Sequence, residues 1–340
     1  MGDKILKAGV IGLGVGERHI EGYLASKNCE VHKFCDKNLS KLKEVQKKYP
    51  NISATTDPND VLFDPTIDVV SIASYDEDHF EQVLKGISSD KHLFVEKPLC
   101  LSRGQLAKIH QSIQKKPHLK IGSNLILRCT PRFKELRRNI ETNQLGRIYY
   151  VEGDYDYGRI EKITSGWRSK ANGYSIVLGG AIHLIDLILW LHRTPVSEVT
   201  AVGSRICTEG TDFAGYDMMV ANLLFVDGSI GRISANFGSV TKHHHRLSVY
   251  GTEGTFSQGH QGAMYQFGRD KSPKEKILDQ GYPAVGKDEL LKNFVLELQG
   301  LCDEQISNGE IFETMNVALA IEEALQCGKA VKVATKAMGA

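Results

Sequence analysis

An ammonium group at the end of a buried strand could do chemistry in this chain. The segment HLFVEKP (His92–Pro98) predicts an apolar β-strand that ends in Glu96, Lys97 and Pro98. Because a buried strand tolerates neither charge without a partner, both charged side chains are expected where the strand runs out. Ligands of a doubly wound sheet bind beyond the carboxyl ends of its strands, so Glu96 and Lys97 would emerge where a ligand binds. A surface turn would explain the same tripeptide, and its place in the sheet decides between the two.

A glycine-rich turn, VIGLGVGERH, follows the first predicted strand. Gly12 and Gly14 fit the pattern G-x-G-x-x-G, but the last glycine comes one position early, at Gly16, and Glu17 stands where glycine or alanine is expected. Such a turn lets the backbone approach a pyrophosphate, and the N–H groups of the next helix bind the anion. Asp36 ends the second predicted strand, where an acid binds a ribose 2′-hydroxyl. This context favours a dinucleotide site over a glycine turn beside a capping aspartate.

A histidine and an aspartate three residues apart lie in the apolar segment GGAIHLIDLILWL. Helical spacing puts His183 and Asp186 on one face, near enough for the carboxylate to orient the imidazole or to share a ligand with it. Gly179 and Gly180 just upstream let the helix start close to another backbone or a bound ligand. Arg128, which follows the last predicted strand of the first half, could reach the same cleft. A histidine that only packs in the core, and an ordinary exposed arginine, are the alternatives.

Three consecutive histidines, His243, His244 and His245, suggest a metal site at first. If they continue a strand, two of them face one way and the third faces the other. One face then offers at most two ligands, and no third ligand is apparent in the sequence. We therefore predict no metal site and interpret the run as a solvated or interface strand.

Short β-branched runs alternate with amphipathic ones over the first 125 residues. Helices are predicted at Asn38–Tyr49 and at Leu101–Lys116, the second opened by Ser102 as N-cap. Alternating strands and helices with apolar strands predict a parallel, doubly wound α/β sheet, so we expect residues 1–125 to form an NAD-binding domain. The predicted strands are Ala8–Gly14, Val31–Asp36, Asp68–Ser74, His92–Pro98 and Leu119–Asn124.

The remaining residues, 126–340, predict an α+β domain of a different build. Strands joined by tight turns occupy Val196–Phe267 and favour a large, mainly antiparallel sheet. We expect this domain to bind substrate and to mediate oligomerisation. Its predicted helices are Pro131–Gly146, Ala181–His192, Lys287–Gly309 and Thr314–Lys329.

The composition limits the possible partners. Lys and Arg (42) nearly balance Asp and Glu (41) among the 340 residues, so no net field attracts nucleic acid or an anionic membrane. The seven cysteines form no C-x-x-C pair, which argues against a disulfide scaffold or zinc ribbon and fits a reducing cytoplasm. The longest apolar run, Ser175–Leu191, carries a histidine and an aspartate in its middle, where a membrane span would penalise them. A small-molecule substrate is the expected partner.

The motifs together resemble the Gfo/Idh/MocA family of NAD(P)-dependent oxidoreductases. The likeness rests on the glycine-rich first turn, the acid after the second strand, the E-K-P segment and the H-x-x-D helix, and it covers essentially the whole chain, including YGTEGTF and GKAVKV. It implies hydride transfer between a nicotinamide cofactor and a secondary alcohol or ketone of a sugar, cyclitol or sugar nucleotide. It also implies dimers or tetramers formed through the sheet of the second domain.

By the same resemblance, Lys97 and His183 match the catalytic lysine and histidine of the family. Asp186 matches a substrate-binding acid, and His79 matches a histidine in the segment that passes near the nicotinamide. The predicted cofactor-binding residues are Gly12, Gly14, Gly16, Asp36, His79 and Glu96, and the predicted substrate-binding residues are Asp186 and Arg128.

One position departs from the family pattern. Many members carry an aspartate four residues before the catalytic histidine, where this chain has Gly179. The substrate is therefore open, and a regulatory or sensor protein that binds NAD and a sugar without turnover is the alternative to an enzyme. Asp36 favours NAD, whereas Lys37 beside it leaves NADP possible.

Overall fold

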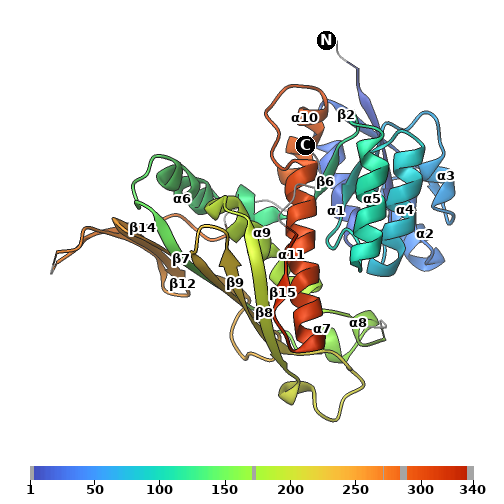
Figure 1. The fold of residues 1–340 in the computed structure, drawn as a ribbon. Helices are drawn as coiled ribbons and strands as arrows, with labels where there is room; N and C mark the ends of the chain where they lie inside the picture. The colour runs from blue at the N-terminus through green and yellow to red at the C-terminus, as the bar shows by residue number, and fades with distance from the viewer. Residues whose placement is uncertain (1–3, 171–173, 271, 284–288, 335–340) are drawn as a thin grey trace. The chain divides into compact units, whose positions relative to one another are not determined.

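The computed structural model describes residues 4–170, 174–270, 272–283 and 289–334 (Figure 1). The chain forms two compact units, which are described separately. The first runs to Ile126 and includes Glu289–Met315, and the second comprises Leu127–Pro283 and Asn316–Ala334. The first break lies one residue beyond the boundary expected at 125. The segment Glu289–Met315, however, groups with the first unit, although the sequence placed it in the second domain.

The first unit contains a parallel six-stranded sheet in the order β3-β2-β1-β4-β5-β6. All of β4 and most of β5 are buried, as expected for strands covered on both faces. The order reverses between β1 and β4, so the predicted doubly wound fold is confirmed. The strands are β1 (Leu6–Ile11), β2 (Cys29–Cys35), β3 (Ser53–Thr55), β4 (Val69–Ile72), β5 (His92–Val95) and β6 (Ile121–Ser123).

Helices cover this sheet in two groups. Helix α1 packs with α10, and α4 packs with α5. Side chains cap two of the helices: Asn38 Oδ1 accepts the N–H of Ser40 at 3.0 Å, and Ser102 Oγ accepts the N–H of Gln105 at 3.2 Å. The predicted Ser102 cap is thus confirmed. The helices are α1 (Gly16–Leu24), α2 (Leu39–Lys48), α3 (Asn59–Leu62), α4 (Asp76–Ser88), α5 (Arg103–Gln114) and α10 (Glu289–Leu298).

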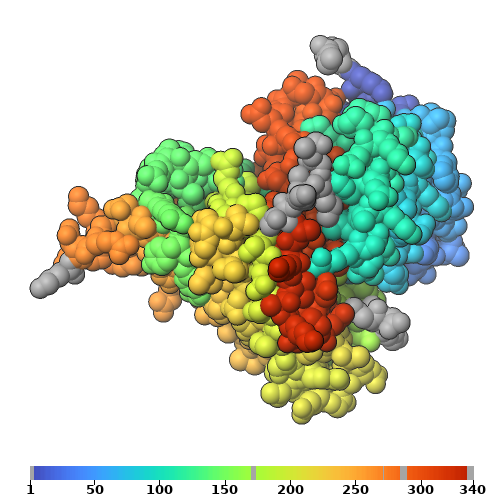
Figure 2. All heavy atoms as spheres, in the orientation of Figure 1, coloured from blue at the N-terminus to red at the C-terminus, as the bar shows by residue number. Residues whose placement is uncertain are grey.

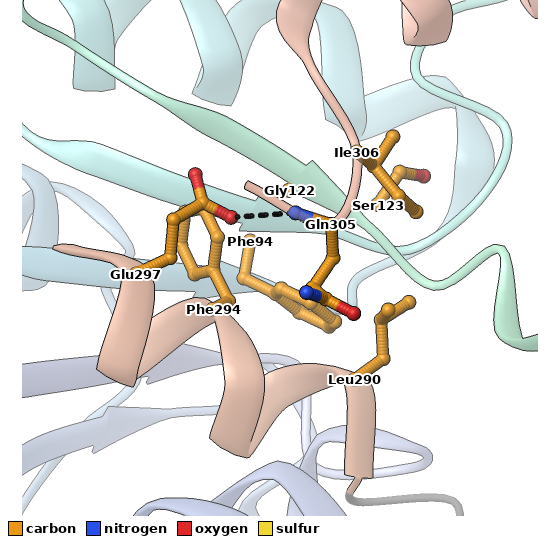
Figure 3. Close-up of a pocket in the computed structure, with 8 residues that line it drawn as sticks. All are labelled: Phe94, Gly122, Ser123, Leu290, Phe294, Glu297, Gln305 and Ile306. Carbon is orange, nitrogen blue, oxygen red and sulfur yellow. Dashed lines mark hydrogen bonds between the residues drawn. The ribbon is translucent and has the colours of Figure 1, made fainter. Parts of the chain in front are cut away.

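A small apolar pocket lies where α10 covers β5 and β6 (Figure 3). Gly122 lies between two rings here: a Cβ on it would come within 2.8 Å of the Phe94 ring and 2.9 Å of the Phe294 ring. The backbone N–H of Gln305 donates to Glu297 Oε2 at 3.2 Å beside it. Such close approach of rings marks a packing seam rather than a ligand site, and it explains why α10 belongs to the first unit.

The second unit contains a nine-stranded sheet in the order β14-β13-β12-β11-β7-β10-β9-β8-β15. Neighbouring strands are antiparallel except β7 and β10, which are parallel. The mainly antiparallel sheet is confirmed, but its central strand β7 lies outside the predicted strand region. The edge strand β14 projects with β13 as a narrow arm (Figure 2). The strands are β7 (Ile148–Asp156), β8 (Val196–Ser204), β9 (Met218–Phe225), β10 (Ile230–Asn236), β11 (His244–Gly251), β12 (Gly254–Gly259), β13 (Gly262–Phe267), β14 (Lys274–Leu278) and β15 (Val331–Lys332).

Helix α9 packs on one face of this sheet, against β7. Gly153 of β7 permits the approach, since the place of its missing Cβ is 3.3 Å from the Leu184 side chain. Helix α6 ends at Glu141, before the predicted Gly146, which instead lies in a turn with φ +70°. No described helix is long and apolar enough to cross a membrane. The helical segments are η1 (Ile126–Cys129), α6 (Pro131–Glu141), α7 (Glu161–Thr164), α8 (Trp167–Lys170), η2 (Val177–Ala181), α9 (Ile182–His192), η3 (Ile206–Thr208) and α11 (Asn308–Cys327).

Candidate active site

The glycine turn between β1 and α1 is shaped by the loop that follows β4. Gly12 has φ +85°, and a Cβ there would lie 2.3 Å from the carbonyl oxygen of Ala73, so only glycine fits. Nothing lies within 4 Å of the place of a Cβ on Gly14, which leaves the backbone open to a ligand. Gly16 begins α1, and the place of its Cβ is 3.0 Å from Val10.

Asp36 is hydrogen-bonded to this turn directly after β2. Its Oδ2 accepts the N–H of Leu13 at 2.7 Å, and its Oδ1 accepts the N–H of Asn38 at 2.7 Å. Each carboxylate oxygen retains a lone pair that a ribose hydroxyl could use. An open backbone at Gly14, a helix N-terminus and a fixed acid together fit an adenine dinucleotide.

Glu96 and Lys97 directly follow β5, as predicted. Glu96 Oε1 accepts a hydrogen bond from Asn124 Nδ2 at 2.8 Å and lies 3.2 Å from His19 Nε2. Burial raises the pKa of Glu96, but the hydrogen bond and charge of His19, the charge of Lys97 and the bond from Asn124 together lower it to about 2. An ionised carboxylate therefore lies beside Lys97 at neutral pH.

His79 connects two loops at the same edge of the sheet. It is buried in α4, with Nδ1 2.7 Å from the carbonyl oxygen of Pro98 and Nε2 3.2 Å from that of Ser74. Its observed contacts therefore position the backbone next to Lys97. Direct contact between His79 and a cofactor stays a prediction.

His183 lies near the start of α9, after a π-helical turn. The turn η2 contains Gly179 and Gly180, and a Cβ on Gly180 would come within 2.8 Å of the Tyr155 ring. The Tyr155 ring stacks on the imidazole of His183, with 6.3 Å between centroids and 17° between planes. Ser175 Oγ accepts the N–H groups of Val177 and Leu178 and so begins the turn. Such π turns often occur at functional sites.

Asp186 and Arg128 are brought together in the second unit. The Arg128 guanidinium donates to both carboxylate oxygens of Asp186, with Nη2–Oδ1 at 2.6 Å and Nε–Oδ2 at 3.0 Å. Both side chains are buried, at 4% and 0% exposure. This bidentate pair fixes η1 against α9. Substrate contact by either residue stays a prediction.

The histidine run lies beside His183 instead of facing solvent. His243 and His245 share a face, with ring centroids 4.9 Å apart, and each lies edge-on to Tyr155 at 5.1 Å. Burial, then the neighbouring imidazoles of His243 and His183, lower the pKa of His245 well below its usual value. The expected alternation along the strand is confirmed, whereas the solvated strand is wrong for the buried His245. Among the described residues, no group of three His, Cys, Asp or Glu could hold a metal ion.

Sequence reasoning missed three side chains of these sites. His19 and Asn124 bind Glu96, and Tyr155 packs on His183. The spacing of His19 after the glycine turn was visible, but only the fold brings it to Glu96. Tyr155 could have been found only by recognising β7 as a strand.

Two family models match the chain. The model described as "Oxidoreductase family, NAD-binding Rossmann fold" matches residues 6–122, and the model described as "GFO/IDH/MocA C-terminal domain" matches residues 133–257. The chain belongs to the Gfo/Idh/MocA family. It is therefore an oxidoreductase with an NAD-binding Rossmann domain, and the predictions of family, enzyme class and cofactor are confirmed.

Characterised members resemble the chain over most of its length. It is 28% identical over 288 residues to a myo-inositol 2-dehydrogenase of Thermotoga maritima, covering 77% of this chain and 82% of that protein. It is 26% identical over 204 residues to a scyllo-inositol 2-dehydrogenase (NAD(+)) of Bacillus subtilis, covering 60% and 58%. The fold matches that of a levoglucosan dehydrogenase in complex with NADH, with TM-score 0.84, 21% identity and coverage of 96% and 99%.

Proposed function

We propose that this chain oxidises a secondary alcohol of a sugar or cyclitol with NAD⁺, or reduces the corresponding ketone. The observation that supports this proposal most is that hydrogen bonds hold the residues on both sides of Lys97. Glu96, held by His19 and Asn124, precedes it, and the carbonyl of Pro98, held by His79, follows it. These contacts fix the backbone of Lys97 at the carboxyl edge of β5, where ligands of such sheets bind.

The residues divide the proton chemistry between them. In the oxidative direction NAD⁺, when bound, would supply the acceptor for the hydride that leaves the carbon bearing the hydroxyl group. The hydroxyl proton passes to the imidazole of His183, and the carbon–oxygen bond becomes a carbonyl. The ammonium of Lys97 stabilises the negative charge that develops on the oxygen. In the other direction His183 returns the proton.

Assays of NADH formation test this function. The purified chain is incubated with NAD⁺ and a panel of myo-inositol, scyllo-inositol, glucose and levoglucosan, and absorbance of reduced nicotinamide is followed. Turnover of any of them supports the proposal. Saturable binding of NAD⁺ and of a panel member without NADH formation would favour the regulatory alternative.

Asp36 supports a preference for NAD over NADP. Its carboxylate, fixed on the backbone of Leu13 and Asn38, would accept ribose hydroxyls and repel a 2′-phosphate. The neighbouring Lys37 ion-pairs with Asp78 at 2.9 Å, which reduces its availability to a phosphate. Titration with NADH and NADPH compares the two, and tighter NADPH binding would contradict the preference. We further propose that the chain forms homo-oligomers through the sheet of the second unit.

A further inference from the structure

The side-chain space of position 179 is filled by a neutral phenol. A Cβ on Gly179 would lie 2.1 Å from the hydroxyl oxygen of Tyr174 and 2.5 Å from its Cζ. Tyr174 is nearly buried and contacts Trp167 edge-on at 5.9 Å. An aspartate at 179 therefore does not fit while Tyr174 keeps this place. At position 179, four residues before His183, a phenol thus fills the space in which a carboxylate would repel anions.

Two guanidinium groups of this unit lie over aromatic rings, and one of them lies over this phenol. Arg168 lies 4.6 Å over the ring of Trp167 and 5.5 Å over that of Tyr174, and Arg159 lies 5.3 Å over Tyr157. Throughout the described part of the chain, neither guanidinium has a carboxylate within ion-pair distance. Stacking on rings restrains each group but leaves its in-plane N–H donors available.

Both positive charges act on the ring that packs against His183. Burial and the nearby phenols of Tyr157 and Tyr174 raise the pKa of Tyr155, while Arg159 and Arg168 act in the opposite direction. The two guanidiniums therefore lie close enough to the Tyr155 hydroxyl to influence it, and Tyr155 stacks on the imidazole of His183.

The carboxylates near this place are engaged elsewhere. Glu322 is hydrogen-bonded to Ser175, and burial raises the pKa of Glu322. Asp186 is paired with Arg128. These two carboxylates therefore do not neutralise the guanidiniums of Arg159 and Arg168.

We propose that the substrate carries a carboxylate, as a sugar acid does, and that Arg168, assisted by Arg159, binds it beside the Tyr155–His183 stack. The inference rests on the proposed function, since it names the class of alcohol that the site takes. A guanidinium binds a carboxylate through two parallel hydrogen bonds, which gives orientation as well as charge. The Tyr174 phenol carries no negative charge, whereas an acid at position 179 would oppose binding.

Trp167 reports on this place directly. The chain has two tryptophans, so Trp190→Phe leaves Trp167 as the only one. This protein is titrated with D-glucuronate and with D-glucose at equal ionic strength in the presence of NAD⁺, and indole emission is followed. We expect glucuronate to bind at least about tenfold more tightly than glucose, and Arg168→Gln to abolish that difference. Calorimetry on the unsubstituted chain gives the same comparison without a change at Trp190.

A control variant with the same change of charge accompanies Arg168→Gln. Lys162→Gln removes a positive charge from α7 without a change to the aromatic rings, and the preference should persist in it. Equal affinity for both sugars, tighter binding of glucose, no saturable change with glucuronate, or a preference that survives Arg168→Gln would overturn the proposal.

NADH formation from the same sugars separates this inference from the proposed function. Preferential binding of glucuronate without NADH from any sugar tested would contradict the proposed function and leave the charge preference standing. Formation of NADH from glucose, together with no binding of glucuronate, would support the proposed function and contradict the charge preference.

Discussion

Lys97 and His183 have unlike surroundings, and these suit unlike roles. The charge of Lys97 helps to lower the pKa of Glu96, so an ionised carboxylate is the neighbour of Lys97 along the chain. His183 has an aromatic ring on one face and lies close to His245, and its surroundings are dominated by rings. A fixed cation suits stabilisation of an alkoxide, and an imidazole suits transfer of a proton.

The roles of Lys97 and His183 predict a loss of turnover without a loss of cofactor. If each group acts in the transition state, Lys97→Ala and His183→Ala should each lower kcat about a hundredfold or more. NAD⁺ affinity should change little, because the glycine turn and Asp36 supply most of it. Steady-state kinetics and NAD⁺ titration measure the two effects, with the exposed His118→Ala as control. A near-normal kcat in His183→Ala would show that the imidazole of His183 only packs in the core and does not transfer the proton.

The pKa of Glu96 predicts how acid acts on the first unit. Because this pKa is lowered from 4.5 to about 2, the stabilisation by ionised Glu96 is complete above pH 4.5 and is lost as pH falls toward 2. Glu96→Gln should lower stability by on the order of 2–3 kcal/mol at pH 7. The difference in Tm between the two proteins should shrink as pH falls from about 5 to about 2. A difference that stays constant over that range would show that the charge of Glu96 is not responsible.

At the scale of elements, the sequence predicted five of the six strands of the parallel sheet, because each of these is a short apolar run between polar helices. It missed β3, a three-residue strand with no buried residue. The strand β7 was missed because Glu152, Asp154 and Asp156 share one of its faces and mask its period-2 pattern, although Asp154 and Asp156 are buried. The strand register shows how these acids are paired: Arg232 on β10 and Arg246 on β11 lie opposite them and form ion pairs. Such pairing across three strands cannot be seen along one segment.

The sequence also did not predict the π turn before α9, nor that α10 packs in the first unit. Helical periodicity predicted α9 and the shared face of His183 and Asp186, but not that Asp186 would pair with Arg128 from η1. Residue types predicted Glu96 and Lys97 at a strand end. Their partners His19 and Asn124 come from α1 and from the residue after β6, and only the sheet order brings these elements together.

The glycine turn predicts a contrast between two neighbouring glycines. Gly12→Ala puts a Cβ 2.3 Å from the Ala73 carbonyl at a φ of +85°, so it should lower Tm by several degrees and weaken NAD⁺ binding. Gly14→Ala meets no atom within 4 Å, so Tm should stay unchanged while NAD⁺ affinity falls. Thermal unfolding and cofactor titration distinguish them. Equal losses of Tm in both variants would contradict a ligand-facing role for Gly14.

At the scale of the whole molecule, the nine-stranded sheet has a second face, opposite the one on which α9 packs against β7. On that face the ring centroids of Tyr150 and Tyr250 lie 5.5 Å apart, and the ion pairs of Arg232 and Arg246 surround Asp154. Strand β9 alternates buried and more exposed residues, and its exposed positions include the apolar Leu224. Rings and neutralised charges beside exposed aliphatic groups are typical of a surface that pairs with another sheet.

The open face of the sheet predicts assembly of the chain with itself. Val202, Leu224 and Ile230 are 71%, 44% and 50% exposed, and the strand register places all three on this face. A second copy would bury them symmetrically, and a stable dimer needs about 800 Å² from each partner. Light scattering at micromolar concentration should therefore give a mass of at least two chains.

Leu224→Asp should weaken association about tenfold or more, because it would bury an unpaired charge. Phe63→Asp, at an exposed position of the first unit, should leave the mass unchanged, and a monomeric mass for the unsubstituted chain would refute the assembly.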